Sequence, residues 1–203
     1  VLAMKNQINR IADRLVKAFN TNTVINPIPV KYCKNINLAN KLRKLCEDQI
    51  KDETIGIKAG GTGIQALKKL KEKEPFTAKV FKKRLVKSGQ NVKINQHTKG
   101  IEVEVYYFIK KSFFDFKGKV TKSNVTKFIK FMGPCFEIVG FRQRNKKFTY
   151  LGDICGDFGF NIKFVVGRKT KFKKLNLNNL KTSLVSKKNG CLLYTSPSPR
   201  DCK

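Results

Sequence analysis

Apolar residues in the first part of the chain recur at the three- and four-residue spacing of amphipathic helices. This pattern predicts one helix over residues 8–19 and a second over residues 38–50. The loop between them contains Pro27 and Pro29, which interrupt regular structure. A shorter helix is predicted over residues 64–73. Helices therefore come first along the chain.

Later segments have the composition of β-strands. The strongest prediction is residues 101–109 (IEVEVYYFI), which are rich in β-branched and aromatic side chains. The other predicted strands are residues 54–58, 135–141, 161–166, 175–177 and 182–186. Residues 125–132 keep helical spacing after Ser123 and predict one more helix, which ends before Gly133. Helices followed by strands predict an α+β fold with a β-rich mixed sheet or roll, rather than repeating βαβ units.

Composition is compatible with one globular domain or part of a larger one. The chain has 203 residues, of which 40% are apolar, and its formal net charge is +30, from 44 Lys and Arg against 14 Asp and Glu. Such a charge would attract nucleic acid at low salt. The lysines are nevertheless spread along the sequence and not gathered in one stripe. We therefore favour compositional drift and expect no nucleic-acid partner.

Several classes of protein are disfavoured by what the sequence lacks. It has no apolar run of eighteen residues and no charged-then-apolar leader, so neither a transmembrane helix nor a secretory signal is expected. The six cysteines form no C-x-x-C pair and no zinc-type cluster. Reduced thiols in a cytoplasmic protein without a membrane partner are the simplest interpretation.

The composition changes abruptly after Gly190. Residues 191–201 (CLLYTSPSPRD) resemble the translation of a sequencing-library adapter. We therefore expect residues 1–190 to form a single, partial domain and residues 191–203 to lie outside the fold. On this interpretation the natural chain is cut short at its C-terminus.

The few acidic residues include a pattern that suggests a metal site. Glu102 and Glu104 stand two residues apart in the strongest predicted strand, so both carboxylates point to one face. Glu137 lies in another apolar strand. Like charges in an apolar setting repel, and Mg²⁺ or Mn²⁺ would relieve this by binding three oxygens. A solvated strand face paired with lysines explains the same spacing equally well.

Four other positions are candidates for a functional or structural role. Lys58 precedes a glycine turn at a strand end, where an ammonium group could hold a carboxylate or enolate, or transfer a proton. His97 is the only histidine and is interpreted as a surface loop residue, so no histidine-based triad is available. Asp153 and Asp157 are interpreted as turn or capping residues.

A series of motifs runs through most of the chain in a characteristic order. The segments are residues 11–15 (IADRL), 26–28 (NPI), 56–62 (GIKAGGT), 74–76 (EPF), 100–105 (GIEVEV), 134–139 (PCFEIV), 153–157 (DICGD) and 164–167 (FVVG). Together they resemble the 2-keto-4-pentenoate hydratase and 2-oxo-3-hexenedioate decarboxylase family of the fumarylacetoacetate hydrolase-like superfamily. The resemblance covers about residues 8–190 and implies a fold of that type, incomplete at its C-terminus.

The resemblance also implies a site and a reaction. It assigns Glu102, Glu104 and Glu137 to Mg²⁺ or Mn²⁺, Lys58 to catalysis, and Lys58, Arg142 and Asp157 to substrate binding. The reaction would be hydration of 2-hydroxypenta-2,4-dienoate to 4-hydroxy-2-oxopentanoate, in the catabolism of aromatic-derived 2-oxo acids. A decarboxylase or C–C hydrolase of the same superfamily is the alternative, and a homo-oligomer is expected.

The chain departs from the family pattern near the implied substrate. The family's E-P-D-F segment reads EPF at residues 74–76, without the acid that is thought to act in acid–base chemistry. Phe158 and Phe160 replace an Asn and a Ser, and Gly100 replaces an Arg. The chain therefore keeps the three carboxylates of the family pattern, while several residues expected around the substrate differ from it. This leaves a catalytically impaired relative, or a non-enzymatic basic protein that binds nucleic acid, as further alternatives.

Overall fold

The structure is a computed structural model that describes residues 2–94, 96–174, 182–185 and 192–196. The chain divides into two compact units, and each is described here by itself. The first consists of Val1–Leu85, Asn91–Gly100 and Ile138–Lys163, and the second of Val86–Gln90, Ile101–Glu137 and Phe164–Lys203.

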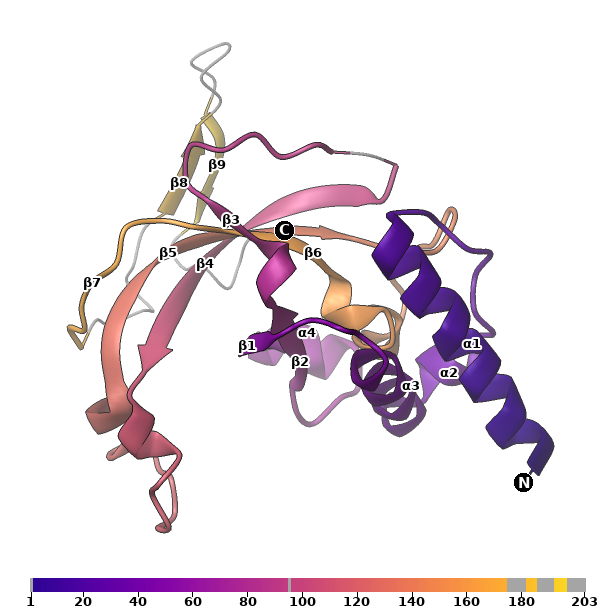
Figure 1. Ribbon diagram of the computed structural model, residues 1–203, viewed down its shortest axis with the longest axis horizontal. Helices are drawn as coiled ribbons and strands as arrows, with labels where there is room; N and C mark the ends of the chain where they lie inside the picture. The colour runs from indigo at the N-terminus through magenta and orange to yellow at the C-terminus, as the bar shows by residue number, and fades with distance from the viewer. Residues whose placement is uncertain (1, 95, 175–181, 186–191, 197–203) are drawn as a thin grey trace. The chain divides into compact units, whose positions relative to one another are not determined.

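Helices dominate the first unit (Figure 1). They are α1 (Leu2–Thr21), α2 (Lys31–Lys34), α3 (Ile36–Asp48), α4 (Ile64–Lys69) and α5 (Leu151–Cys155). Helices α1 and α3 pack against each other through fully buried side chains that include Leu15 and Leu42. The Asn35 side chain caps α3 by accepting hydrogen bonds from the backbone N–H groups of Asn37 and Leu38. The two long helices predicted from the apolar periodicity are thus present, and both begin earlier than expected.

A two-stranded antiparallel sheet completes the first unit. It pairs β1 (Thr54–Gly60) with β2 (Phe76–Phe81), in a register that sets Lys58 opposite Ala78 and Gly60 opposite Phe76. Phe76, Ala78 and Phe81 are buried on β2 and join the helical core. This sheet therefore fixes the position of Lys58 within the unit.

The largest sheet has five strands. Its path runs β3 (Leu85–Lys87), β6 (Asn161–Val166), β5 (Ile129–Gly140) and β4 (Thr98–Ile109), and β7 (Thr170–Lys171) pairs antiparallel with β5. Unit boundaries fall within β3, β4, β5 and β6. A separate antiparallel pair joins β8 (Thr182–Val185) to β9 (Leu192–Ser196). The order of the strands in this sheet differs from their order in the sequence, and the chain combines the sheet with helices. The fold is therefore mixed α+β, which confirms the predicted fold class.

The helix predicted over residues 125–132 is wrong. Only Val125–Phe128 form a short 3₁₀ turn, and β5 begins at Ile129 and continues through Gly133 and Pro134. The Pro134 carbonyl accepts a hydrogen bond from the Gly167 N–H at 2.9 Å, so pairing continues past the proline on its carbonyl side. The helical spacing of apolar residues here reflects burial on a strand, which periodicity does not distinguish over so short a run.

Two predictions concern the C-terminal part. The strand over residues 175–177 lies outside the described residues. Within 191–203, only Leu192–Ser196 is described, as β9. The expected boundary at residue 190 stays a prediction. Over the described part of the chain, none of the helices combines the length and the apolar character needed to cross a membrane.

Replacing Leu42 with alanine should test the helical core directly. Leu42 is fully buried between helices, so Leu42→Ala should lower the free energy of unfolding by about 2–5 kcal/mol. Leu85→Ala makes the same substitution at a side chain that is 39% exposed and should have a much smaller effect. Urea denaturation of both variants measures the difference, and equal losses would contradict this description of the core.

Candidate metal centre

Three glutamates meet on neighbouring strands of the second unit. Glu102 and Glu104 project from one face of β4, and Glu137 projects from the adjacent β5. Carboxylate oxygens of the three residues all lie within 4.8 Å of one another. Glu137 is 2% exposed, while Glu102 and Glu104 are half-buried. The strand alternation anticipated for Glu102 and Glu104 is thus present, and the sheet brings Glu137 beside them.

The donor set fits a hard divalent cation. Three carboxylate oxygens match the ligand preference of Mg²⁺, Mn²⁺ or Ca²⁺. Octahedral Mg²⁺ holds adjacent ligand oxygens about 3 Å apart, which modest side-chain rotation reaches from the observed spacing. Partial exposure of Glu102 and Glu104 leaves the cluster accessible from one side. The three glutamates could therefore hold such an ion and leave positions for an external ligand.

Two further side chains share the face of the glutamates. Tyr106 follows Glu104 by two residues on β4, and its hydroxyl donates to the Gly167 carbonyl at 3.2 Å. Cys135 precedes Glu137 by two residues on β5 and is 6% exposed. Burial, and to a smaller extent the nearby charges of Glu137 and Glu104, raise the pKa of the Cys135 thiol to about 12.

Sequence reasoning missed both neighbours of the cluster. The same two-residue alternation that grouped Glu102 with Glu104 places Tyr106 on their face, and applied to Glu137 it identifies Cys135. Gly133 belongs to this face as well, because a Cβ there would lie 2.6 Å from the Tyr106 ring. The glycine thus makes room for the tyrosine beside the carboxylates.

Lys58 lies in the first unit on β1. Its ammonium group donates to the carbonyl of Gly159 at 2.9 Å, so a residue one hundred positions away in sequence orients it. Lys58 is half-buried, and the Cδ atom of its side chain passes close to Gly159. Its assigned role in catalysis and substrate binding stays a prediction.

Arg142 and Asp157 form a buried ion pair. Asp157 is fully buried and accepts from the Arg142 backbone N–H at 2.8 Å, the Arg142 guanidinium at 3.3 Å and the Gln143 amide at 3.1 Å. Arg142 also donates to the Asn161 carbonyl at 2.6 Å. Burial lowers the pKa of Arg142, and the Asp157 carboxylate counteracts that effect. The structure thus brings these two predicted residues together as a buried pair, and their contact with substrate stays a prediction.

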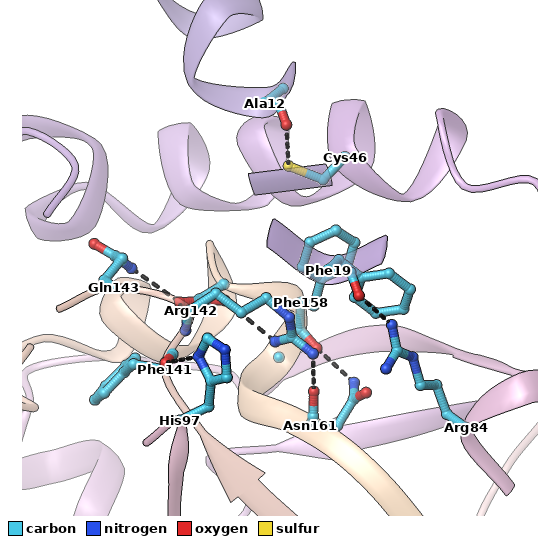
Figure 2. Close-up of polar contacts among 12 residues, drawn as sticks. Ala12, Phe19, Cys46, Arg84, His97, Phe141, Arg142, Gln143, Phe158 and Asn161 are labelled. Carbon is cyan, nitrogen blue, oxygen red and sulfur yellow. Dashed lines mark hydrogen bonds and ion pairs between the residues drawn. The ribbon is translucent and has the colours of Figure 1, made fainter. Parts of the chain in front are cut away.

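Aromatic rings cover this ion pair. The Phe19 and Phe158 rings stack with centroids 4.3 Å apart, and the Arg142 guanidinium lies about 5 Å from both. Arg84 covers Phe19 at 3.7 Å and donates to the Phe19 carbonyl (Figure 2). Burial, together with the charge of Arg142, lowers the pKa of Arg84 to about 10. Sequence reasoning did not anticipate this cluster, because its members are distant along the chain.

His97 is buried, so its interpretation as a surface residue is wrong. It is 1% exposed, and its Nδ1 atom lies 3.2 Å from the Phe141 carbonyl oxygen. The physical reason is Gly140, where a Cβ would fall 1.7 Å from the His97 carbonyl oxygen. The missing side chain lets the turn around residue 97 pack directly on the backbone.

Asp153 has the capping role expected for it. Its Oδ2 atom accepts from the backbone N–H groups of Thr149 and Tyr150, at the start of α5. Lys146 lies 2.6 Å from its other oxygen and 3.6 Å from the Cys33 thiol. The pKa of Asp153 is lowered: burial, the largest effect, opposes this and is outweighed by the hydrogen bonds from Lys146 and the two backbone groups. All four cysteines in the described part of the chain are free thiols, as expected.

An open pocket of about 620 Å³ lies elsewhere in the first unit. It is bounded by α3 residues that include Lys41 and Lys44, and by Phe76 and Thr77 of β2. None of the predicted site residues lines it. The pocket therefore does not bear on the metal centre.

Comparison with known proteins supports the fold. No family model matches the sequence, and no curated protein matches it. Two solved structures of 4-oxalocrotonate decarboxylase from Pseudomonas putida G7 are similar over 94% of this chain and 73% of theirs. One, complexed with magnesium and adipate, has a TM-score of 0.69 at 15% identity. The other, complexed with calcium and acetate, has a TM-score of 0.72 at 16% identity. The chain therefore has the mixed α+β fold of these decarboxylases, the fumarylacetoacetate hydrolase-like type expected from its sequence.

Removing one charge of the buried ion pair should destabilise the first unit. Asp157→Asn leaves Arg142 charged and places amide hydrogens against donors, so we expect a loss of about 3–5 kcal/mol in unfolding free energy. Asp48→Asn is the matched control, because Asp48 pairs with Lys79 at the surface and its side chain is 69% exposed. Chemical denaturation at pH 7 distinguishes the two, and a stability unchanged in Asp157→Asn would contradict this role.

Proposed function

We propose that the chain is a metal-dependent lyase acting on 2-oxo or 2-hydroxydienoic acids, specifically a hydratase of 2-hydroxypenta-2,4-dienoate. The observation that carries the proposal is the cluster of Glu102, Glu104 and Glu137. Three convergent carboxylates on two adjacent strands form a rigid oxygen site, which suits a cation that must also accept substrate oxygens. The fold shared with magnesium- and calcium-bound decarboxylase structures supports the same conclusion.

The cluster and Lys58 have separate tasks in this proposal. A divalent cation bound by the three glutamates would supply Lewis acidity toward the carboxylate and 2-oxo oxygens of the substrate. Lys58 carries ammonium hydrogens that can donate to a developing enolate or transfer a proton to carbon. In the overall reaction one water molecule adds across the terminal double bond, and 2-hydroxypenta-2,4-dienoate becomes 4-hydroxy-2-oxopentanoate.

Decarboxylation is the second candidate. The two similar structures are decarboxylases, and one is complexed with adipate, a six-carbon dicarboxylate. A related site in this chain would convert 2-oxo-3-hexenedioate to the five-carbon dienoate and carbon dioxide. The same carboxylate cluster would serve both reactions, because in each of them the 2-oxo acid passes through its enolate form.

The aromatic substitutions bear on activity rather than on metal binding. Phe158 is buried and Phe160 is half-buried, with the Phe160 ring 4.6 Å from that of Phe141. Neither side chain can replace the hydrogen bonds of the Asn and Ser that the family pattern has there. Two forms of the proposal are consistent with these substitutions. Either the chain acts on a substrate with fewer polar groups, or it binds the metal and has lost catalytic turnover.

Further properties belong to the same proposal. Mn²⁺ is proposed alongside Mg²⁺ because both accept carboxylate and water ligands. The family resemblance implies a small-molecule substrate and a homo-oligomeric state, and the cysteine pattern favours a cytoplasmic location. All three stay predictions. The +30 net charge is interpreted as composition and not as a nucleic-acid site.

Metal binding can be tested apart from turnover. The folded chain should bind one Mn²⁺ saturably, and Glu102→Gln, Glu104→Gln or Glu137→Gln should each weaken binding at least about tenfold, because each removes a charged ligand. Calorimetry and the electron paramagnetic resonance signal of free Mn²⁺ report the affinity. Glu53→Gln, at an exposed glutamate, should bind as the unchanged chain does. Equal affinity in all four variants would refute the site.

The reaction is tested by product identity. With Mg²⁺ or Mn²⁺ present, the dienoate absorbance should disappear and 4-hydroxy-2-oxopentanoate should form, and a chelator should abolish the rate. Carbon dioxide release from 2-oxo-3-hexenedioate would instead assign the chain to decarboxylation. A folded, metal-bound chain that converts neither compound would exclude both reactions while leaving the metal site in place.

A further inference from the structure

We infer that the turn formed by Phe158, Gly159 and Phe160 (the 158–160 turn) is a positioning element for the ammonium group of Lys58. The inference deepens the proposed function and rests on it for its catalytic meaning. Its structural content, that Gly159 sets the direction of Lys58, can be tested without substrate.

The 158–160 turn holds an unusual backbone conformation. Three consecutive residues have positive φ angles, 53° at Phe158, 67° at Gly159 and 72° at Phe160. Residues other than glycine rarely adopt this left-handed backbone conformation, and bulky aromatic residues are especially disfavoured in it. Such strain persists only where the surroundings over-determine the conformation, and it concentrates at functional sites.

The surroundings fix the turn at both ends (Figure 2). Asp157, just before it, is held by Arg142 and Gln143, and its carbonyl accepts from the Phe160 N–H at 2.9 Å. Asn161, just after it, donates its side-chain amide to the Phe158 carbonyl at 2.5 Å. Hydrogen bonds therefore close the turn on itself and tie it to the buried ion pair.

The two aromatic side chains of the turn pack against different phenylalanines. Phe158 stacks on Phe19 and is 1% exposed. Phe160 packs against Phe141 with ring centroids 4.6 Å apart. Burial of the Phe158 ring and partial burial of the Phe160 ring offset the backbone strain, because moving either ring out would expose apolar surface to water. The residues that depart from the family pattern are thus the ones that hold the turn in place.

The turn places the carbonyl of Gly159 beside the Lys58 ammonium group. The ammonium group donates a hydrogen bond to this carbonyl, with an oxygen–nitrogen distance of 2.9 Å. Ala78, which is opposite Lys58 in the β1–β2 register, packs against the same glycine, and a Cβ at position 159 would lie 2.6 Å from the Ala78 Cβ. Gly159 is therefore required both by its φ angle and by the close approach of β2.

The consequence is a fixed direction for Lys58. A lysine side chain has four rotatable bonds and an ammonium group with three equivalent donors. The hydrogen bond from one N–H to Gly159 restricts the rotamers that the side chain can adopt. A methyl group at position 159 would push the turn away from β2 and remove the acceptor from the ammonium group.

The test compares Gly159→Ala with Gly89→Ala. Both replace a positive-φ glycine, but a Cβ at Gly89, with φ of 87°, meets nothing within 4 Å. The primary readout is competitive acetylation of the intact chain by acetic anhydride, with the Lys58 rate measured by peptide mass spectrometry against the other lysines. Gly159→Ala should change the relative Lys58 rate at least threefold, and Gly89→Ala should leave it unchanged. An unchanged rate in folded Gly159→Ala would overturn the inference.

A second variant protects the test against misfolding. Ala78→Gly removes the atom closest to the new methyl group, so Ala78→Gly/Gly159→Ala should return the Lys58 rate part of the way toward that of the unchanged chain, while the strain from the φ angle remains. Failure of this double variant to recover the rate, in a folded protein, would also count against the inference.

Kinetics then connect the turn to turnover. Gly159→Ala should lower kcat more than it changes KM, with Mn²⁺ affinity unaltered, and it should have no further effect on kcat in a Lys58→Met background. Additive losses would show that the turn does not act through Lys58. A changed Lys58 rate in a chain that converts no dienoate or 2-oxo acid would uphold the positioning and refute the proposed function, so the two can fail separately.

Discussion

The buried carboxylate of Asp157 is the interaction on which the organisation of the first unit depends. It is fully excluded from solvent and is neutralised by Arg142, which binds it through both backbone and side chain. Gln143 links the same carboxylate to the loop after α1, because its amide oxygen accepts from the Ile28 N–H at 3.0 Å. Removing one partner of such a pair strands a charge in an apolar interior, which is far more costly than losing a surface pair.

The strained turn follows from this constraint. Asp157 and Asn161 bracket residues 158–160, and the buried Phe158 ring and the half-buried Phe160 ring keep the backbone in its left-handed conformation. In this conformation the Gly159 carbonyl accepts a hydrogen bond from Lys58. In the second unit, the alternation of β4 and β5 gathers three carboxylates, with Tyr106 and Cys135 beside them. Each unit thus brings together one kind of chemistry, a directed ammonium group in the first and a cation site in the second.

Local sequence patterns predicted the features that depend on residues close together in the chain. Helical periodicity located α1 and α3, and two-residue alternation put Glu102 and Glu104 on one face. Glu137 was grouped with them as a third acid in an apolar strand, and the family resemblance assigned all three to the metal, because strand order is not encoded in a local pattern. His97 was misplaced since its burial depends on the missing side chain of Gly140, forty-three residues away. No local signal predicts a left-handed turn with phenylalanine at two of its three positions, because packing against residues distant in sequence contributes to its stability.

The most direct test of the account is diffraction from crystals of the chain soaked in Mn²⁺, with data collected to use the anomalous signal of manganese. The account predicts one strong anomalous peak about 2 Å from carboxylate oxygens of Glu102, Glu104 and Glu137. A peak held by other residues, or no peak at saturating Mn²⁺ in crystals with these side chains ordered, would contradict it.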